Sequence, residues 1–294
     1  MTASSDTPAF SPTPPLEPIR PTRRVRWLED EQLDRLQDAT LKVLEEVGVK
    51  FPDERSLDIL AAHGCHADRA TQVVTFPRDV VRRAMATVPR TFTMAARNPD
   101  FDLRLEEGTS YYTLDGCGVA ALDPETRVER PSRKSDLEAQ ARVADWLPGI
   151  GFIWPTVSAQ DHGRTSQLHE IDAVFNNTVK HFQAMVMGED AARFAVEMAT
   201  VVAGTPEELR RRPVLSNLVC SVAPLAEEHT RTHMKTSLRR GLERDLVNNR
   251  YRDPVEVARE RAMAVRASHR PEPLETAKRA ELTRILGAAR GVLG

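Results

Sequence analysis

The segment from Lys180 to Leu225 decides the fold of this chain, and it reads KHFQAMVMGEDAARFAVEMATVVAGTPEELRRRPVLSNLVCSVAPL. Its pattern predicts a strand over His181–Met187, a helix over Glu189–Ala203 and a second strand over Val214–Val222. Gly204 follows the helix directly, where glycine supplies the left-handed conformation that ends helices. A strand, a helix and a strand in succession are typical of a crossover between parallel strands. The segment therefore predicts an α/β fold built on a parallel sheet.

The same alternation occurs before this segment. The expected elements are a strand over Tyr111–Leu114, a helix that ends near Trp146, a strand over Ile150–Val157 and a helix marked by Leu168, Ile171 and Phe175. Ser135 and Glu138 have the spacing of a capping box at the start of the first helix. The chain then holds about four βα units, whereas a closed TIM barrel needs eight. We therefore expect a TIM-barrel-type parallel β/α fold that is incomplete and has two open strand edges.

Four regions follow from this pattern. Residues 1–28 are rich in proline and poor in apolar side chains, which predicts a disordered tail. Residues 29–108 predict a small N-terminal α+β cap, and residues 109–225 hold the partial barrel. Residues 226–294 predict a helical C-terminal segment. Its last helix carries an apolar stripe that must pack against the barrel or another subunit, formed by Leu282, Ile285, Leu286 and Val292.

Composition excludes several classes of function. The 41 basic and 43 acidic residues leave a net charge of −2, so neither nucleic acid nor a membrane is an expected partner. No apolar run approaches the roughly 20 residues that span a bilayer. Three cysteines are too few for a disulfide framework and favour a cytoplasmic protein. The run His63-Gly64-Cys65-His66 has ligand side chains but no second pair at suitable spacing, so no metal site is expected.

A series of short motifs occurs in a characteristic order. They are Leu33–Val49 followed by Phe51-Pro52-Asp53, His63–Asp68, Pro89–Arg97, Arg130-Pro131-Ser132 with Asp136, Asn177–His181, Arg212-Pro213, Ala223-Pro224-Leu225, Glu228–His233, and Glu260-Arg261-Ala262 leading to Pro271–Leu274. In this order and spacing the chain resembles the trimethylamine methyltransferase family. This is the corrinoid-dependent group whose archetype contains pyrrolysine.

The resemblance implies a TIM-barrel enzyme that moves a methyl group from a methylated amine to a corrinoid. The corrinoid (cobalamin) is carried by a partner protein, so no cofactor is expected to bind this chain directly. Members without pyrrolysine are similar in fold and often take quaternary amines such as glycine betaine. The family segment that holds the later strands and the pyrrolysine position is missing between Leu225 and Glu228. No residue of this chain therefore inherits the catalytic role.

The chemistry of a quaternary amine suggests candidate binding residues. Its demethylation removes no proton from nitrogen, so the site must hold a cation and expose one methyl group. Aromatic rings and carboxylates attract alkylammonium groups, and barrel sites form where strands end. The candidates on or just after expected strands are Tyr112, Asp115, Trp154 and His162. Only one of Tyr111 and Tyr112 faces inward, because strand side chains alternate, and we favour Tyr112. Core packing remains the alternative for the aromatic residues.

Three interpretations of function stay open at this point. The chain is an internally shortened methyltransferase that has lost activity, or a working one whose barrel is completed by another chain. We expect a homo-oligomer in the second case, since open strand edges drive association. The third interpretation is a non-catalytic module that binds a small molecule or the corrinoid protein. Methyl transfer to the corrinoid separates the second interpretation from the other two.

Overall fold

The computed structural model describes residues 12–23, 26–116, 118–218, 244–245, 250–251 and 254–293. These residues form two compact units. One contains residues 21–92, and the other contains the described residues up to Arg20 together with those from Thr93 onward. Residues 93–108, which the sequence pattern assigned to the cap, thus belong to the larger unit.

The smaller unit is an α+β arrangement. Its elements are α1 (Asp30–Glu46), β1 (Val49–Lys50), α2 (Glu54–Ala62), β2 (His66–Asp68), β3 (Val73–Thr75) and α3 (Arg78–Thr87). The strands form an antiparallel sheet in the order β1-β3-β2. Gly48 has a φ of +74°, and a side-chain carbon there would lie 2.3 Å from the Val74 carbonyl oxygen, so this turn requires glycine. Cys65 lies in the core beside Leu57 and Val74, which gives this cysteine a packing role.

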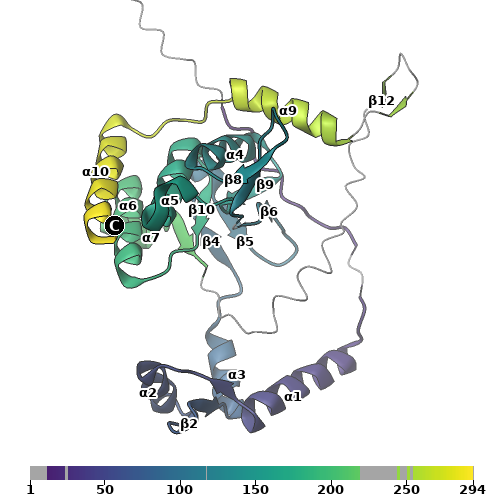
Figure 1. Cartoon of the computed structure of the whole chain (residues 1–294). Coiled ribbons are helices and arrows are strands. Elements are labelled where there is room, and N and C mark those ends of the chain that lie inside the picture. Colours follow the sequence, from purple (N-terminus) through teal and green to yellow (C-terminus); the bar gives the residue numbers. More distant parts are fainter. Residues whose placement is uncertain are drawn as a thin grey trace, which may run out of the picture. The chain divides into compact units, whose positions relative to one another are not determined.

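A parallel sheet is the centre of the larger unit (Figure 1). Its strands are β6 (Tyr112–Thr113), β9 (Ile150–Ile153), β10 (His181–Ala184) and β11 (Leu215–Asn217). They lie in the order β11-β10-β9-β6, and every pair is parallel. The expectation of an α/β fold with sequential parallel strands is confirmed.

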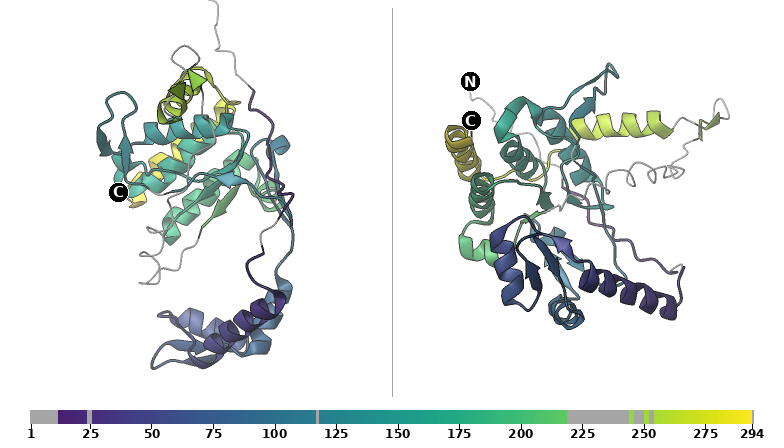
Figure 2. Two further views of the ribbon diagram at one scale, coloured as in Figure 1. Left: turned by 90° about the vertical axis from the view of Figure 1, so that its right-hand side faces the viewer. Right: turned by 60° about the horizontal axis from the view of Figure 1, so that its bottom comes forward.

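Helices cover one face of this sheet. They are α4 (Lys134–Trp146), α5 (Ser166–Asn177), α6 (Glu189–Ala203), α7 (Pro206–Arg211) and α10 (Thr276–Leu293). The core combines apolar side chains of the strands, such as Ile153 and Phe182, with those of the helices, such as Phe175. α10 lies outside α6 (Figure 2), and its residues Leu282, Ile285 and Leu286 are buried in the same core. The predicted stripe thus packs against the sheet unit, although Val292 is exposed.

Several elements differ from their predicted bounds. The strands are shorter than the apolar runs that suggested them. β9 ends at Ile153, before Pro155, and β10 ends at Ala184, before the loop that contains Gly188. Residues 219–222 of the predicted fourth strand lie outside the described residues. α4 begins at Lys134, where the Asp136 carboxylate accepts a hydrogen bond of 2.9 Å from the Arg133 backbone N–H, so the cap predicted at Ser135 is wrong. The Thr205 hydroxyl caps α7 by accepting a hydrogen bond of 3.0 Å from the Glu208 N–H.

Further short elements frame the sheet. They are β4 (Phe92–Met94), η1 (Pro99–Phe101), β5 (Leu103–Leu105), β7 (Ala120–Leu122), β8 (Glu129–Pro131), β12 (Arg244–Asp245), β13 (Arg250–Tyr251) and α9 (Pro254–Ser268). The hairpin of β7 and β8 was not predicted from the sequence. α9 packs along α4 (Figure 1).

Residues 12–20, predicted as part of the disordered tail, are held against the larger unit. The residues between the prolines make the contacts: the Glu17 N–H donates to the Pro148 carbonyl at 2.9 Å, and Ile19 forms a β-bridge with Ser110. The Thr13 hydroxyl donates to Asp145 at 2.5 Å. Proline lacks an N–H, but it leaves its neighbours free to bond.

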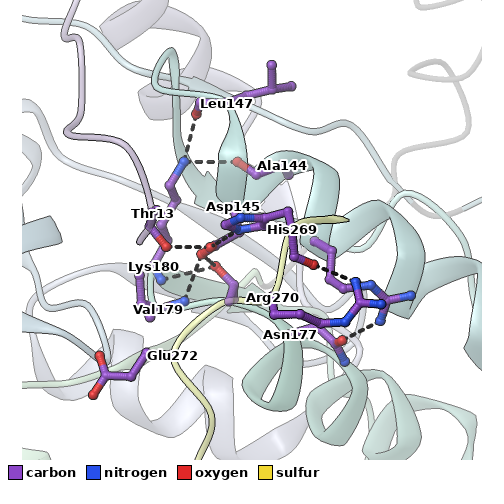
Figure 3. Close-up of polar contacts among 12 residues, drawn as sticks. Thr13, Ala144, Asp145, Leu147, Asn177, Val179, Lys180, His269, Arg270 and Glu272 are labelled. Atoms are coloured by element: carbon purple, nitrogen blue, oxygen red, sulfur yellow. Dashed lines mark hydrogen bonds and ion pairs between the residues drawn. The ribbon is translucent and has the colours of Figure 1, made fainter. Parts of the chain in front are cut away.

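Asp145 is the centre of a buried polar network at the amino end of β10 (Figure 3). Besides Thr13, its carboxylate accepts hydrogen bonds from the Thr178 hydroxyl at 2.7 Å, the Val179 N–H at 2.8 Å and His269 Nε2 at 2.8 Å. Burial alone would raise the pKa of Asp145, but these donors lower it below its usual value. The network therefore joins the N-terminal segment, the sheet and the segment after α9.

Lys180 is fully buried in the same region (Figure 3). Its ammonium group donates to the carbonyl oxygens of Ala144, Leu147 and Ile150 at 2.9, 2.7 and 2.7 Å. Burial lowers the pKa of Lys180 to about 8, while the nearby Asp145 charge opposes that fall. All three donors are satisfied, so Lys180 acts as a cationic cap on the carboxyl end of α4.

Candidate functional site

The loops after β6 and β9 meet at the carboxyl edge of the sheet. The Gly118 N–H donates to the Thr156 carbonyl at 2.9 Å, and the Ser158 N–H donates to the Gly118 carbonyl at 2.8 Å. The Ser132 hydroxyl also donates to the Ser158 carbonyl, at 2.7 Å. These bonds hold the two loops together. Ligand sites of parallel α/β folds lie beyond the carboxyl ends of the strands, which makes this edge the candidate site.

Two of the predicted site residues are brought together here. The half-buried Trp154 indole lies against Gly116, where a side-chain carbon would be 2.9 Å from the ring and 2.2 Å from the Pro155 carbonyl oxygen. Asp115 precedes this glycine and is exposed, and its carboxylate accepts the Gly116 N–H at 3.0 Å. Among the described residues, the buried Trp154 Nε1 has no hydrogen-bond partner. The edge therefore combines an aromatic ring, a carboxylate and an unpaired donor.

Tyr112 lies on β6, apart from these contacts. Its side chain is 62% exposed, while the neighbouring Tyr111 packs on Gly151 of β9. The two tyrosines thus face opposite sides of the strand. Among the described residues, no hydrogen bond or ring contact joins Tyr112 to Trp154.

His162 lies in η2 (Gln160–Thr165), the turn that leads into α5. Its ring stacks on His169 of α5 with centroids 3.5 Å apart and planes 10° from parallel. Burial lowers the pKa of both rings, and that of His169 falls to about 4, so His169 is neutral at pH 7. Asp161 accepts a hydrogen bond of 2.9 Å from the Lys134 backbone N–H and thereby fixes η2 to the start of α4. His162 is thus held by packing as well as by its place after β9.

Glu170 is a titratable residue at this edge that the sequence analysis missed. Its carboxylate lies below the loop after β9 and is only 7% exposed, with the Ala159 N–H at 3.3 Å. Burial raises the pKa of Glu170 to about 7, although hydrogen bonds from Ala159 and Ser158 oppose the rise. Its position beside His169 in a buried helix face, between Leu168 and Ile171, is the sequence signal that could have identified it.

Glu170→Gln should change the pH dependence of stability. A carboxyl group with an ordinary pKa of 4.5 and a folded pKa of about 7 keeps its proton longer in the folded chain. The free energy of unfolding of the unmodified chain should therefore fall as pH rises from about 5 to 7, by up to about 3 kcal/mol. The glutamine variant should lack this fall and be more stable at pH 8. Thermal unfolding from pH 5 to 8 measures it.

Glu189→Gln is the matched control, because Glu189 is exposed at the start of α6. Its pH profile should coincide with that of the unmodified chain. Parallel profiles for the Glu170 variant and the unmodified chain would show that Glu170 does not titrate in this range.

The described residues contain no group of three or more histidine, cysteine, aspartate or glutamate side chains arranged to hold a metal ion. Within the same part of the chain, no helix has both the length and the apolar character needed to cross a membrane.

Comparison with known proteins identifies the family. The model of trimethylamine methyltransferase (MTTB) matches residues 3–244, which is most of the chain. The chain belongs to the trimethylamine methyltransferase family. The resemblance inferred from the sequence motifs is therefore confirmed.

Individual relatives agree with this assignment. Trimethylamine methyltransferase MttB of Desulfitobacterium hafniense is 32% identical over 197 residues, which cover 67% of this chain and 40% of the relative. Trimethylamine methyltransferase MttB of Methanosarcina barkeri is 30% identical over 201 residues, covering 66% and 41%. A glycine betaine methyltransferase of Desulfitobacterium hafniense is 24% identical over 200 residues, covering 67% and 41%. The match thus spans about two-fifths of each of these family members.

Proposed function

We propose that this protein binds a methylated or quaternary amine, glycine-betaine-like or trimethylamine, and transfers one methyl group to a corrinoid protein. The observation that carries the proposal is the contact of Trp154 with the Asp115–Gly116 turn at the carboxyl edge of the sheet. A tryptophan face is the strongest of the aromatic cation binders, and a nearby carboxylate adds charge attraction. Membership of a methyltransferase family supports the same assignment.

In this reaction the main task of the protein is to position the amine. The bond between the methyl carbon and nitrogen breaks, its electron pair stays on nitrogen, and the amine leaves without losing a proton. A corrinoid carried by the partner protein would supply the nucleophile that accepts the methyl group. Trp154 and Asp115 would hold the cation so that one methyl group faces outward, and His162 would contact the substrate from η2. Positioning of this kind is a large part of catalysis in many enzymes.

Self-association belongs to the same proposal. The four-stranded sheet of the described residues has β6 and β11 at its edges, and parallel edge strands offer unpaired backbone groups to another chain. We propose an incomplete TIM-type barrel in which a second copy covers these edges, in the cytoplasm. The regions proposed from sequence, at 29–108, 109–225 and 226–294, are its parts, except that residues 93–108 belong with the sheet unit. Sedimentation velocity should then give a dimer or larger species, whereas a monomer would contradict this arrangement.

Trp154→Ala should weaken glycine betaine binding about tenfold or more, because a desolvated cation–π contact contributes about 2 kcal/mol. Isothermal titration calorimetry measures the affinity. Trp154→Phe keeps a ring and should lose less. Trp27→Ala is the control, since Trp27 is 88% exposed in the smaller unit, and it should bind as the unmodified chain does. Equal affinities for all variants would exclude Trp154 from the site.

Turnover is measured separately, by the absorbance change of a reduced corrinoid on methylation, with glycine betaine or trimethylamine as donor. Methyl transfer that depends on Trp154 supports the proposed function. Binding of the amine without any methyl transfer would leave a non-catalytic binding protein instead.

A further inference from the structure

Glu170 is a buried carboxyl group that has no part in the proposed methyl transfer. It lies on α5, beneath the loop that follows β9. The Ala159 N–H lies 3.3 Å from Glu170 Oε1, and the Ser158 hydroxyl is a second hydrogen-bond donor to the same carboxyl group. Ala159 is fully buried, so bulk solvent does not reach its N–H. The carboxyl group thus joins the loop to a helix of the core.

The loop that Glu170 contacts also carries the candidate site. It begins directly after Trp154, and the Ser158 N–H joins it to the Gly118 carbonyl in the neighbouring loop. Gly118 comes two residues after Gly116, against which the Trp154 ring packs. A shift of the loop at Ser158 would therefore also displace the tryptophan. Glu170 acts on the site through the loop, without touching the ligand.

Charged groups on the elements packed against α5 act on partners other than Glu170. Lys134 of α4 bonds to Asp172, while Asp161 and Arg290 lie near the stacked rings of η2 and α5. α6 and β10 turn apolar side chains toward α5, for example Met198 and Phe182. Within the described residues, only the Ala159 and Ser158 donors oppose the effect of burial on Glu170. The strength of these two hydrogen bonds therefore depends on the proton of Glu170 itself.

We propose that Glu170 is a positioning residue of the candidate site, which as a carboxylate fixes the loop after β9 and thereby holds Trp154 in place for the cation. A carboxylate accepts stronger hydrogen bonds than a protonated carboxyl group does. A preorganised site in turn binds its ligand more tightly. The pKa of Glu170, raised by burial to about 7, sets this change between pH 6 and 8. The identity of the cation rests on the proposed function, whereas the control of Trp154 by Glu170 does not.

Tryptophan fluorescence of the full chain tests the positioning without any ligand. The Trp27→Phe/Trp146→Phe variant leaves Trp154 as the sole tryptophan. Its emission should change between pH 6 and 8 with a midpoint near 7, and Glu170→Gln in this background should remove the transition. Ser158→Ala should keep the transition but raise its midpoint, because the carboxylate loses a donor. Glu189→Gln is the matched control, since Glu189 is exposed at the start of α6, and it should leave the transition unchanged.

Isothermal titration calorimetry with glycine betaine extends the test to the ligand. The affinity of the unmodified chain should be about fivefold greater at pH 8 than at pH 6, which corresponds to about 1 kcal/mol between a charge-assisted and a neutral hydrogen bond. Glu170→Gln should bind equally at both pH values, with far-ultraviolet circular dichroism showing that it is folded.

The two measurements separate this inference from the proposed function. Absence of betaine binding at both pH values would contradict the proposed function alone, because the fluorescence transition still reports on Glu170. Lack of a transition near pH 7, or its persistence in the folded Glu170→Gln variant, would overturn the inference. Equal betaine affinity at pH 6 and 8 in an unmodified chain that binds betaine would overturn it as well.

Discussion

Asp145→Ala should lower the free energy of unfolding by about 3–5 kcal/mol, since it removes the buried acceptor of four hydrogen bonds and each buried donor left unpaired costs about 1–3 kcal/mol. The carboxylate is fully buried and accepts hydrogen bonds from His269, Thr13, Thr178 and Val179. Alanine would leave all four donors unpaired, and the N-terminal segment and the segment after α9 would lose their shared anchor. Chemical denaturation monitored by circular dichroism measures the loss.

Asp190→Ala provides the control for this experiment. Asp190 is exposed in the first turn of α6 and lies 3.4 Å from Arg193, so its loss should cost about 1 kcal/mol or less. A similar small cost for Asp145→Ala would mean that water replaces the carboxylate. In that case the network would not organise the larger unit.

Local patterns in the sequence account for much of the sheet unit. The alternation of strands and helices predicted that β6, β9, β10 and β11 are parallel. Each strand is marked by a short apolar run, and each intervening helix by apolar residues at helical spacing. The helical stripe of Leu282, Ile285 and Leu286 predicted burial for the same reason. These features depend on residues that are close together in the sequence, so the sequence pattern is enough to predict them.

Contacts between distant residues could not be predicted in this way. Thr13 and His269 lie 132 and 124 positions from Asp145, and no periodicity links them to it. The prolines around Thr13 suggested disorder, yet the intervening residues bond to the sheet unit. Glu170 was missed because a glutamate in a helix is usually solvated, and its burial depends on how the loop after β9 folds over it.

The candidate site was likewise predicted in part: the positions of its residues after strands were predictable, and their contacts with distant residues were not. The rule that ligands bind beyond strand ends placed Asp115 and Trp154 in neighbouring loops, and the structure brings them together through Gly116. The aromatic character of Tyr112 suggested a third member, but its position on the short β6 strand leaves it exposed. His162 was selected for its place after β9, whereas its stacking on His169 depends on the path of η2.

Lys180→Met should also destabilise the chain strongly, by about 3 kcal/mol or more. The ammonium group bonds to the carbonyl oxygens of Ala144 and Leu147 at the carboxyl end of α4 and to that of Ile150 in β9. A hydrogen bond to a charged group contributes about 1.5–3 kcal/mol. Although burial lowers its pKa to about 8, Lys180 is protonated at pH 7. Methionine fills a similar volume but donates no hydrogen bond, so the change isolates the polar contribution.

Lys278→Met is the matched comparison, because Lys278 also bonds to the end of a helix. Its ammonium group donates to one carbonyl, that of Val202 near the end of α6, at 2.9 Å, and it is only partly buried. Its removal should cost about 1 kcal/mol, the usual net value of a single hydrogen bond. Urea denaturation at pH 7 should therefore separate the two variants by about 2 kcal/mol. Equal losses would mean that the desolvation cost of burying the Lys180 charge cancels its additional hydrogen bonds.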